Sequence, residues 1–190
     1  MMESLHSALS FGGILPRESI QKIISFFVPK KFKSNDYFLN AGKVANEIGF
    51  VDTGIFRSFA TGRGGEEVTK YFIRQNQFMV DLESYYEQKP SESSLQAVVE
   101  SKLFVISRSS WTRLNEDIPK LYILTKSLTE ATLLNKIKDN DFLNYGTAKD
   151  KYQEFIKRYP DLIREVPQQY IASYLKITPQ SLSRIRKTIV

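Results

Sequence analysis

The sequence predicts an α+β protein with a β-rich N-terminal part, one long helix and a short helical C-terminal part. Three observations lead to this prediction. Short runs of β-branched and aromatic residues alternate with turn residues between positions 28 and 107. Leucines at helical spacing follow Pro119, without Gly or Pro before Gly146. Three shorter helical patterns fill the rest of the chain.

The β-rich part follows a short amphipathic helix, which we expect at Pro16–Phe27 because Ile20, Ile23 and Ile24 have helical spacing. Glycines such as Gly42, Gly54 and Gly65 separate the β-rich runs and permit tight turns. Short strands at this spacing are typical of a β-sandwich, roll or barrel. The expected strands are Tyr37–Leu39, Ile48–Val51, Ile55–Ala60, Val68–Ile73, Leu95–Val99 and Leu103–Ser107.

The long helix is expected to begin near Pro119 and to run for about 20 residues or more. Its apolar residues repeat at intervals of three and four, and this stripe needs a partner. The β-rich part of the same chain is one candidate, and the same helix in a second copy is the other. We favour the homodimer, in which the interface between the two helices consists of Leu121, Leu124, Leu128 and Ala131.

The last two of the three C-terminal helices, expected at Gln168–Leu175 and Pro179–Ile189 after one at Lys149–Tyr159, have the pattern of a helix-turn-helix. Ala172 is small enough for the helices to cross there, and Thr178 is a good N-cap before Pro179. The turn of such a unit usually contains Gly, because one residue adopts the left-handed conformation, whereas this chain has Lys176.

The outer face of the second helix predicts DNA binding. Glutamine pairs with adenine and arginine with guanine, while serine, threonine and lysine suit phosphates. An ordinary helical hairpin with a basic surface is the alternative interpretation. The candidate DNA-binding residues are Thr178, Gln180, Ser181, Ser183, Arg184 and Lys187.

Charge agrees with an anionic partner for the C-terminal part. The chain has 27 Lys and Arg against 21 Asp and Glu, a net charge of +6. After residue 147 there are nine basic and four acidic residues, so +5 of the charge lies there. A solvated basic tail would have the same composition. Single arginines of the β-rich part (Arg57, Arg63 and Arg74) could hold an anion, although solvation is the commoner fate of such residues.

The composition argues against most enzymes. The chain has no Cys and one His, His6, which excludes thiolate nucleophiles, iron–sulfur clusters and metal sites with several imidazoles. An enzyme on a cupin-like roll would have only carboxylates as ligands. We therefore expect no enzyme activity, no cofactor and no metal. The start of the chain lacks a signal-peptide pattern, and no apolar run is long enough for a membrane span, so we expect a cytoplasmic protein without a membrane partner.

The chain resembles the Crp/Fnr family of transcription regulators. The resemblance runs from Asn40-Ala41-Gly42 through Gly54-Ile55-Phe56-Arg57 and is most specific in the element Ile171-Ala172-x-x-Leu175-x-Ile177-Thr178-x-x-x-Leu182-Ser183-Arg184. It implies a double-stranded β-roll of the cyclic-nucleotide-binding type as sensor (1–118), a dimerisation helix and hinge (119–146) and a DNA-binding domain (147–190). It also implies that Gln180 and Arg184 read bases, and that the partners are double-stranded DNA, a second copy and RNA polymerase.

The phosphate cassette departs from the family pattern. Members that bind cyclic nucleotides have Phe-x-Gly-Glu and, ten residues after the Glu, an Arg that pairs with the phosphate. This chain has Phe78-Met79-Val80-Asp81 and then Ser91-Glu92. We therefore expect no cyclic AMP binding in the usual manner. The missing Cys and suitable His also exclude the iron–sulfur and haem sensors of the family.

Aromatic residues around the cassette leave two interpretations open. They could line a pocket for an unidentified small-molecule effector, although such residues more often pack a core. The candidate pocket consists of Phe72, Phe78, Val80, Asp81, Ser91 and Glu92, with Tyr85 and Tyr86 nearby. A sensor that works mainly by binding a cyclic nucleotide or another small molecule is the alternative function.

Overall fold

The structure is a computed structural model that describes residues 2–189, and it divides into two compact units. The first unit contains the described residues through Ser58 together with Phe72–Glu130. The second contains Phe59–Tyr71 and the chain from Ala131 onward. The boundary falls inside helix α5 (Lys120–Asn144), which contributes to both units. No helix in residues 2–189 has the length and apolar character that crossing a membrane requires.

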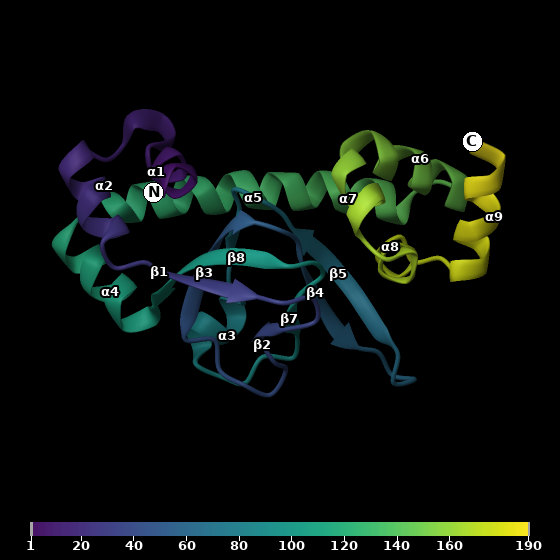
Figure 1. The fold of residues 1–190 in the computed structure, drawn as a ribbon, viewed down its shortest axis with the longest axis horizontal. Coiled ribbons are helices and arrows are strands. Elements are labelled where there is room, and N and C mark those ends of the chain that lie inside the picture. The colour runs from purple at the N-terminus through teal and green to yellow at the C-terminus, as the bar shows by residue number, and fades with distance from the viewer. Residues whose placement is uncertain (1, 190) are drawn as a thin grey trace. The chain divides into compact units, whose positions relative to one another are not determined.

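The strands form a β-roll of two four-stranded sheets, one ordered β1-β8-β3-β6 and the other β2-β7-β4-β5 (Figure 1). Most of the roll belongs to the first unit, whereas the end of β4 and most of β5 belong to the second. Phe32 of the first sheet and Phe56 of the second lie with ring centroids 5.5 Å apart, so the sheets share a core. The predicted roll is confirmed. The strands are β1 (Val28–Phe32), β2 (Tyr37–Leu39), β3 (Glu47–Thr53), β4 (Phe56–Thr61), β5 (Glu67–Ile73), β6 (Phe78–Met79), β7 (Ser94–Ala97) and β8 (Ser101–Ser107).

The six predicted strands coincide with β2, β3, β4, β5, β7 and β8, whereas β1 and β6 were not predicted. Strand β1 was missed because Pro29, Lys30 and Lys31 interrupt the apolar pattern. It lies at the edge of its sheet, where proline costs no ladder hydrogen bond and lysines discourage pairing with another chain. Strand β6 has two residues, too few for a pattern.

The turn between β3 and β4 confirms the role expected for Gly54. Its φ is +102°, and a Cβ at this position would lie 2.1 Å from Ser101 Oγ. Only glycine fits both constraints.

Five helices of the first unit accompany the roll, and the sequence predicted only α2 with clear bounds. Helix α1 packs by Leu5 and Leu9, which are fully buried. Ile20 and Ile23 of α2 are buried as predicted. The elements are α1 (Glu3–Leu9), the 3₁₀ turn η1 (Phe11–Gly13), α2 (Arg17–Ile24), α3 (Leu82–Glu87) and α4 (Arg108–Asp117).

In the second unit Phe155 is fully buried, and its ring lies 5.4 and 5.6 Å from those of Tyr159 and Tyr174. The helices of this unit are the rest of α5, α6 (Ala148–Arg158), α7 (Pro160–Glu165), α8 (Gln168–Tyr174) and α9 (Pro179–Ile189). The three predicted C-terminal helices match α6, α8 and α9. Helix α7 was not predicted; Pro160 occupies its first turn, and Leu162 is buried. Thr147 and Asp150 form a capping box that starts α6.

Candidate nucleic-acid interface

Helices α8 and α9 form the bihelical unit that the spacing of apolar residues predicted. Ala172, Leu175 and Leu182 are all fully buried, so the two helices meet at these side chains. The amide of Ile177 donates to the carbonyl of Ala172 at 3.0 Å and closes the turn. Thr178 caps α9, because its Oγ1 accepts from the amide of Ser181 at 3.1 Å.

Lys176 occupies the left-handed position of the turn, with φ of +56°. A residue with a Cβ is strained in this conformation by about 1–2 kcal/mol. The glycine that the pattern calls for is absent, yet the turn keeps the geometry. Lys176 Nζ donates to Asn144 Oδ1 at 3.0 Å, a contact that glycine would not make.

Lys176→Gly is expected to raise the free energy of unfolding by about 1 kcal/mol, because glycine relieves the strain but has a larger backbone entropy in the unfolded chain. Urea titration measures the change. Lys176→Ala is the matched control, since it loses the same contact with Asn144 and keeps the strain. Equal stability of the two variants would contradict this account of the turn.

The exposed face of α9 carries four of the predicted DNA-binding residues. Gln180, Ser183, Arg184 and Lys187 are exposed, and helical spacing places them on one side, away from the buried Leu182. The other two residues bind each other, because the Thr178 hydroxyl donates to Ser181 Oγ at 2.9 Å.

A shallow groove beside this face is lined by Gln168, Ser183, Arg186 and Lys187. Two of these residues, Gln168 and Arg186, were not predicted. The position of Gln168 directly after Pro167, at the start of α8, is the only signal that could have pointed to it. The groove adds two hydrogen-bonding side chains to the basic end of α9.

Ser173 on α8 binds the edge of strand β5 within the second unit. Its Oγ accepts from the amide of Thr69 at 2.9 Å and donates to the carbonyl of Glu67 at 3.1 Å. Strand β5 is the last strand of its sheet, so this hydroxyl takes the place of a neighbouring strand at two backbone groups. The sequence motif gave no indication of this contact.

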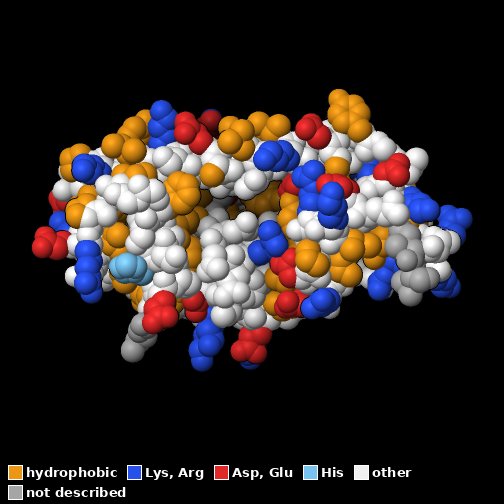
Figure 2. All heavy atoms as spheres, turned by 90° about the horizontal axis from the view of Figure 1, so that it is seen from above, with side chains coloured by type: hydrophobic (Ala, Val, Ile, Leu, Met, Phe, Trp, Pro, Cys, Tyr) orange, Lys and Arg blue, Asp and Glu red, His pale blue; other side chains and the backbone are white. Residues whose placement is uncertain are grey.

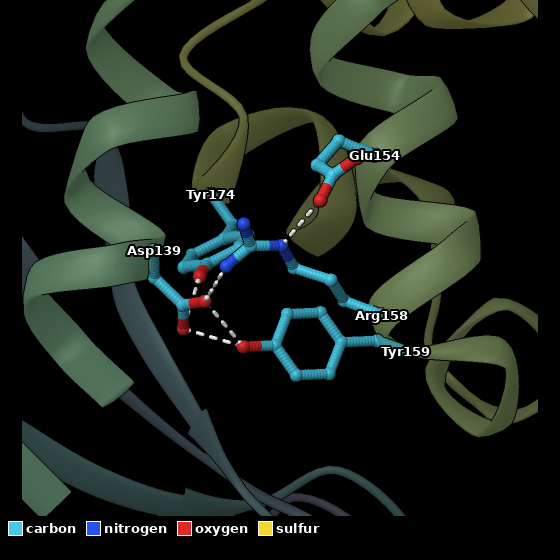
Figure 3. Close-up of polar contacts among 5 residues, drawn as sticks. All are labelled: Asp139, Glu154, Arg158, Tyr159 and Tyr174. Atoms are coloured by element: carbon cyan, nitrogen blue, oxygen red, sulfur yellow. Dashed lines mark hydrogen bonds and ion pairs between the residues drawn. The ribbon is translucent and has the colours of Figure 1, made fainter. Parts of the chain in front are cut away.

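A second group of contacts, here called the Asp139 cluster, ties α5 to the helices that follow it. The cluster consists of Asp139, Glu154, Arg158, Tyr159 and Tyr174 (Figure 3). Tyr159 Oη donates to Asp139 Oδ1 at 2.6 Å, and Tyr174 Oη donates to Asp139 Oδ2 at 3.3 Å. Arg158 donates to Asp139 Oδ1 at 3.3 Å and to Glu154 Oε1 at 2.7 Å. Hydrogen bonding to Arg158 lowers the pKa of Glu154.

Burial of the Tyr174 side chain, followed by the charge of Asp139, raises the pKa of the Tyr174 phenol. The folded chain therefore keeps a proton that the unfolded chain loses above about pH 10, where an ordinary tyrosine ionises. Stability is complete below this pH and decreases above it, because the unfolded state then binds fewer protons than the folded state.

We expect the free energy of unfolding to fall above pH 10 by up to about 1.4 kcal/mol per pH unit for this group. Urea titrations at a series of alkaline pH values measure the slope. Tyr174→Phe removes this contribution and reduces the slope, whereas Tyr145→Phe, at a position 76% exposed, leaves it unchanged. The same slope in Tyr174→Phe and the unaltered protein would refute the assignment.

Helix α5 is apolar on two opposite sides. Leu121 and Leu124, predicted to meet a second chain, are fully buried in their own chain. Leu128 is partly buried, and Ala131 is exposed.

Helical spacing places four other side chains, each 50–59% exposed, on the opposite side: Ile123, Leu133, Leu134 and Ile137. We call these four the outward stripe. Two of the four residues predicted for the dimer interface, Leu121 and Leu124, therefore pack within their own chain. Figure 2 shows hydrophobic side chains at several places on one face of the molecule.

The candidate effector cassette is closed by its own hydrogen bonds. Asp81 Oδ2 accepts from Ser91 Oγ at 2.8 Å, and Asp81 Oδ1 accepts from the amide of Ser84 at 3.0 Å, which caps α3. Ser91 is buried and also binds the backbone of Ser93. Asp81 and Ser91 stand at the positions where the family binds the ribose and the phosphate. In this structure they are hydrogen-bonded to each other.

The remaining cassette residues lie in different environments. Phe78 packs edge to face on Phe50 at 4.9 Å, which is the core role that the sequence favoured. Phe72 and Val80 are partly buried, and Glu92 is exposed. No group of three His, Cys, Asp or Glu residues suited to a metal ion occurs in residues 2–189.

Arg57 is a residue whose environment the sequence misjudged. Solvation was the favoured expectation, but the side chain is 1% exposed. Its Nε and Nη2 both donate to Gln96 Oε1, at 3.0 and 2.7 Å. The guanidinium therefore helps to join β4 and β7 inside the protein.

Comparisons with known proteins agree with this architecture. Residues 29–117 match the family described as "Cyclic nucleotide-binding domain". The catabolite activator protein of Thermus thermophilus is 18% identical, with a TM-score of 0.59 over 96% of this chain and 86% of that chain. The c-di-GMP responsive global regulator CLP of Xanthomonas campestris is 15% identical, with a TM-score of 0.71 over 92% and 91%. FixK2 of Bradyrhizobium japonicum is 16% identical, with a TM-score of 0.71 over 86% and 84%. No curated protein sequence matches the chain significantly.

Proposed function

Since residues 29–117 match the cyclic nucleotide-binding domain family and the chain has the fold of Crp/Fnr-type transcription regulators, we propose that the protein is a homodimeric, DNA-binding transcription regulator. In this proposal residues 1–118 form a sensor domain, 119–146 the dimerisation helix and hinge, and 147–190 the DNA-binding domain. The protein acts in the cytoplasm, without enzyme activity, and RNA polymerase is its partner by analogy with the family.

The observation that carries the proposal is the exposed face of α9 on a correctly closed helix-turn-helix. Ala172 and Leu182 are buried at the helix crossing, while Gln180 and Arg184 are exposed on the outer side. In the proposed complex the amide of Gln180 and the guanidinium of Arg184 enter the major groove, where they pair with adenine and guanine. Lys187 and Ser183 neutralise or bind phosphates of the backbone.

Dimerisation places two such faces on one duplex. The outward stripe on α5 offers four apolar side chains at helical spacing, the arrangement that a two-fold helix seam needs. The few base contacts of each α9 then act twice, which raises both affinity and specificity.

Selection of bound fragments from genomic DNA by the purified protein tests the proposal. The salt concentration has to be stated, because phosphate contacts make affinity fall steeply with salt. We expect a two-fold symmetric consensus. Uniform recovery of all sequences, with no motif at any salt concentration, would refute the proposal.

A sensor that works mainly by binding a cyclic nucleotide is the second candidate, supported by the family match at residues 29–117. The hydrogen bond between Asp81 and Ser91 argues against it, because both groups that would take the nucleotide bind each other. We expect no heat in calorimetric titrations with cyclic AMP or cyclic GMP. A saturable heat with either nucleotide would instead favour the second candidate and require the cassette to open.

A further inference from the structure

One carboxylate on α5 binds three points of the DNA-reading part of the chain (Figure 3). Asp139 accepts hydrogen bonds from Arg158 at the end of α6, from Tyr159 between α6 and α7, and from Tyr174 on α8. These donors lie 19 to 35 positions further along the chain. A single side chain therefore contacts three points of the helices that follow α5.

The donors are themselves held in defined orientations. Arg158 is bound by Glu154 at 2.7 Å, and its guanidinium lies 4.9 Å from the centre of the Phe142 ring. The rings of Tyr159 and Tyr174 lie 5.4 and 5.6 Å from that of the buried Phe155. Because the donor side chains have little freedom, the position of Asp139 determines the orientation of the helices that carry them.

Apolar packing between α5 and the helices that follow it restricts their orientation less than the hydrogen bonds do. Phe142 of α5 meets Tyr174 of α8 at a ring distance of 6.4 Å, but burial of apolar surface does not depend on angle. Hydrogen bonds weaken steeply when their angle changes. Helix α9 is joined to α8 through Ala172 and Leu182, so the orientation set at Asp139 extends to the reading face.

We propose that Asp139 is a positioning residue that sets the distance and angle between the two α9 helices of the dimer, and thereby the half-site spacing that the protein selects. This inference rests on the proposed function, because it requires α5 to join two DNA-bound copies. A dimer of this kind reads half-sites about 34 Å apart, one turn of the duplex. Without Asp139 the two DNA-binding domains of the dimer change their orientation relative to α5. The dimer then binds half-sites at several spacings, each with lower affinity.

The test uses the full chain and synthetic duplexes built from the half-site that the unaltered protein selects. One duplex carries a single half-site, and a series carries two half-sites whose spacing changes by one base pair at a time. Asp139→Asn keeps the shape of the side chain and removes its charge. Tyr159→Phe removes one hydrogen bond and keeps the ring, so it serves if the first variant does not fold.

We expect the unaltered protein to prefer one spacing sharply. Asp139→Asn is expected to bind the best spacing about 10-fold more weakly, to bind other spacings nearly as well as before, and to keep its affinity for the single half-site. Glu165→Gln is the matched control, because it removes the same charge at an exposed position of α7 and should leave the whole profile unchanged.

Three outcomes overturn the inference. A spacing profile in Asp139→Asn that is as sharp as in the unaltered protein would show that other contacts set the spacing. An equal loss of affinity for the single half-site and for every two-site duplex would mean that the substitution merely reduces the fraction of folded protein. Failure of the unaltered protein to bind any selected duplex would overturn the proposed function and this inference together, and only that outcome affects both.

Discussion

Leu134→Glu is expected to dissociate the dimer and to weaken binding to a duplex with two half-sites about 100-fold or more, because the second binding event is no longer intramolecular. Leu134 is 59% exposed within its own chain, so the change should leave the fold of the monomer intact. In a two-fold seam it places two carboxylates against each other in an apolar contact, where the loss of hydration is unfavourable. Sedimentation equilibrium measures the dissociation, and DNA titration measures the loss of affinity.

Asn135→Glu is the control for this experiment. It introduces a carboxylate at the next exposed position of α5, about 100° around the helix and outside the outward stripe. We expect it to remain dimeric. If the Leu134→Glu variant forms a stable dimer, the dimer interface lies on another surface of the chain.

Arg184→Ala is expected to weaken binding to the selected operator by about 1–3 kcal/mol and to relax the preference at one base pair. The exposed guanidinium of Arg184 can form two parallel hydrogen bonds with a guanine edge, and alanine forms none. Titration with the operator and with its single-base variants measures both effects. Equal affinity of Arg184→Ala and the unaltered protein for the operator would remove Arg184 from the set of base-reading residues.

Lys187→Ala distinguishes base reading from phosphate contact. Lys187 is exposed on the same face of α9, and a lysine that binds phosphate contributes equally to all sequences. This variant is expected to weaken binding uniformly and to reduce the slope of log affinity against log salt by about 1. A loss of affinity that depends on the base sequence would instead assign Lys187 to base contacts in the major groove.

The parts of the fold that sequence could predict are those that depend on local pattern. Alternating apolar runs and turn glycines located six of the strands, and Thr178 with Pro179 located the start of α9. The apolar pattern of α5 located the helix but not its orientation. Both sides of α5 are apolar, and which of them is buried depends on tertiary packing, which helical spacing does not contain.

The exposed face of α9 was predictable because its residues belong to one helix with a recognisable motif. The Asp139 cluster was not, because Asp139 and Tyr174 are 35 positions apart and aspartate and tyrosine have many ordinary roles on protein surfaces. Arg57 was misjudged for a related reason. An arginine on a strand is expected in solvent, and its burial depends on Gln96, which another strand supplies.

The hydrogen bond between Asp81 and Ser91 also limits how this β-roll can evolve. Replacing Ser91 by the arginine of the nucleotide-binding cassette removes a buried hydroxyl that binds both Asp81 and the backbone of Ser93. Such a change would cost about 1–3 kcal/mol for the buried backbone of Ser93, which loses its partner. The nucleotide would still meet Val80 in place of glycine and the shorter Asp81 in place of glutamate. The present side chains of the cassette therefore serve its folding, and phosphate binding of the usual kind would need changes at Val80, Asp81 and Ser91 together.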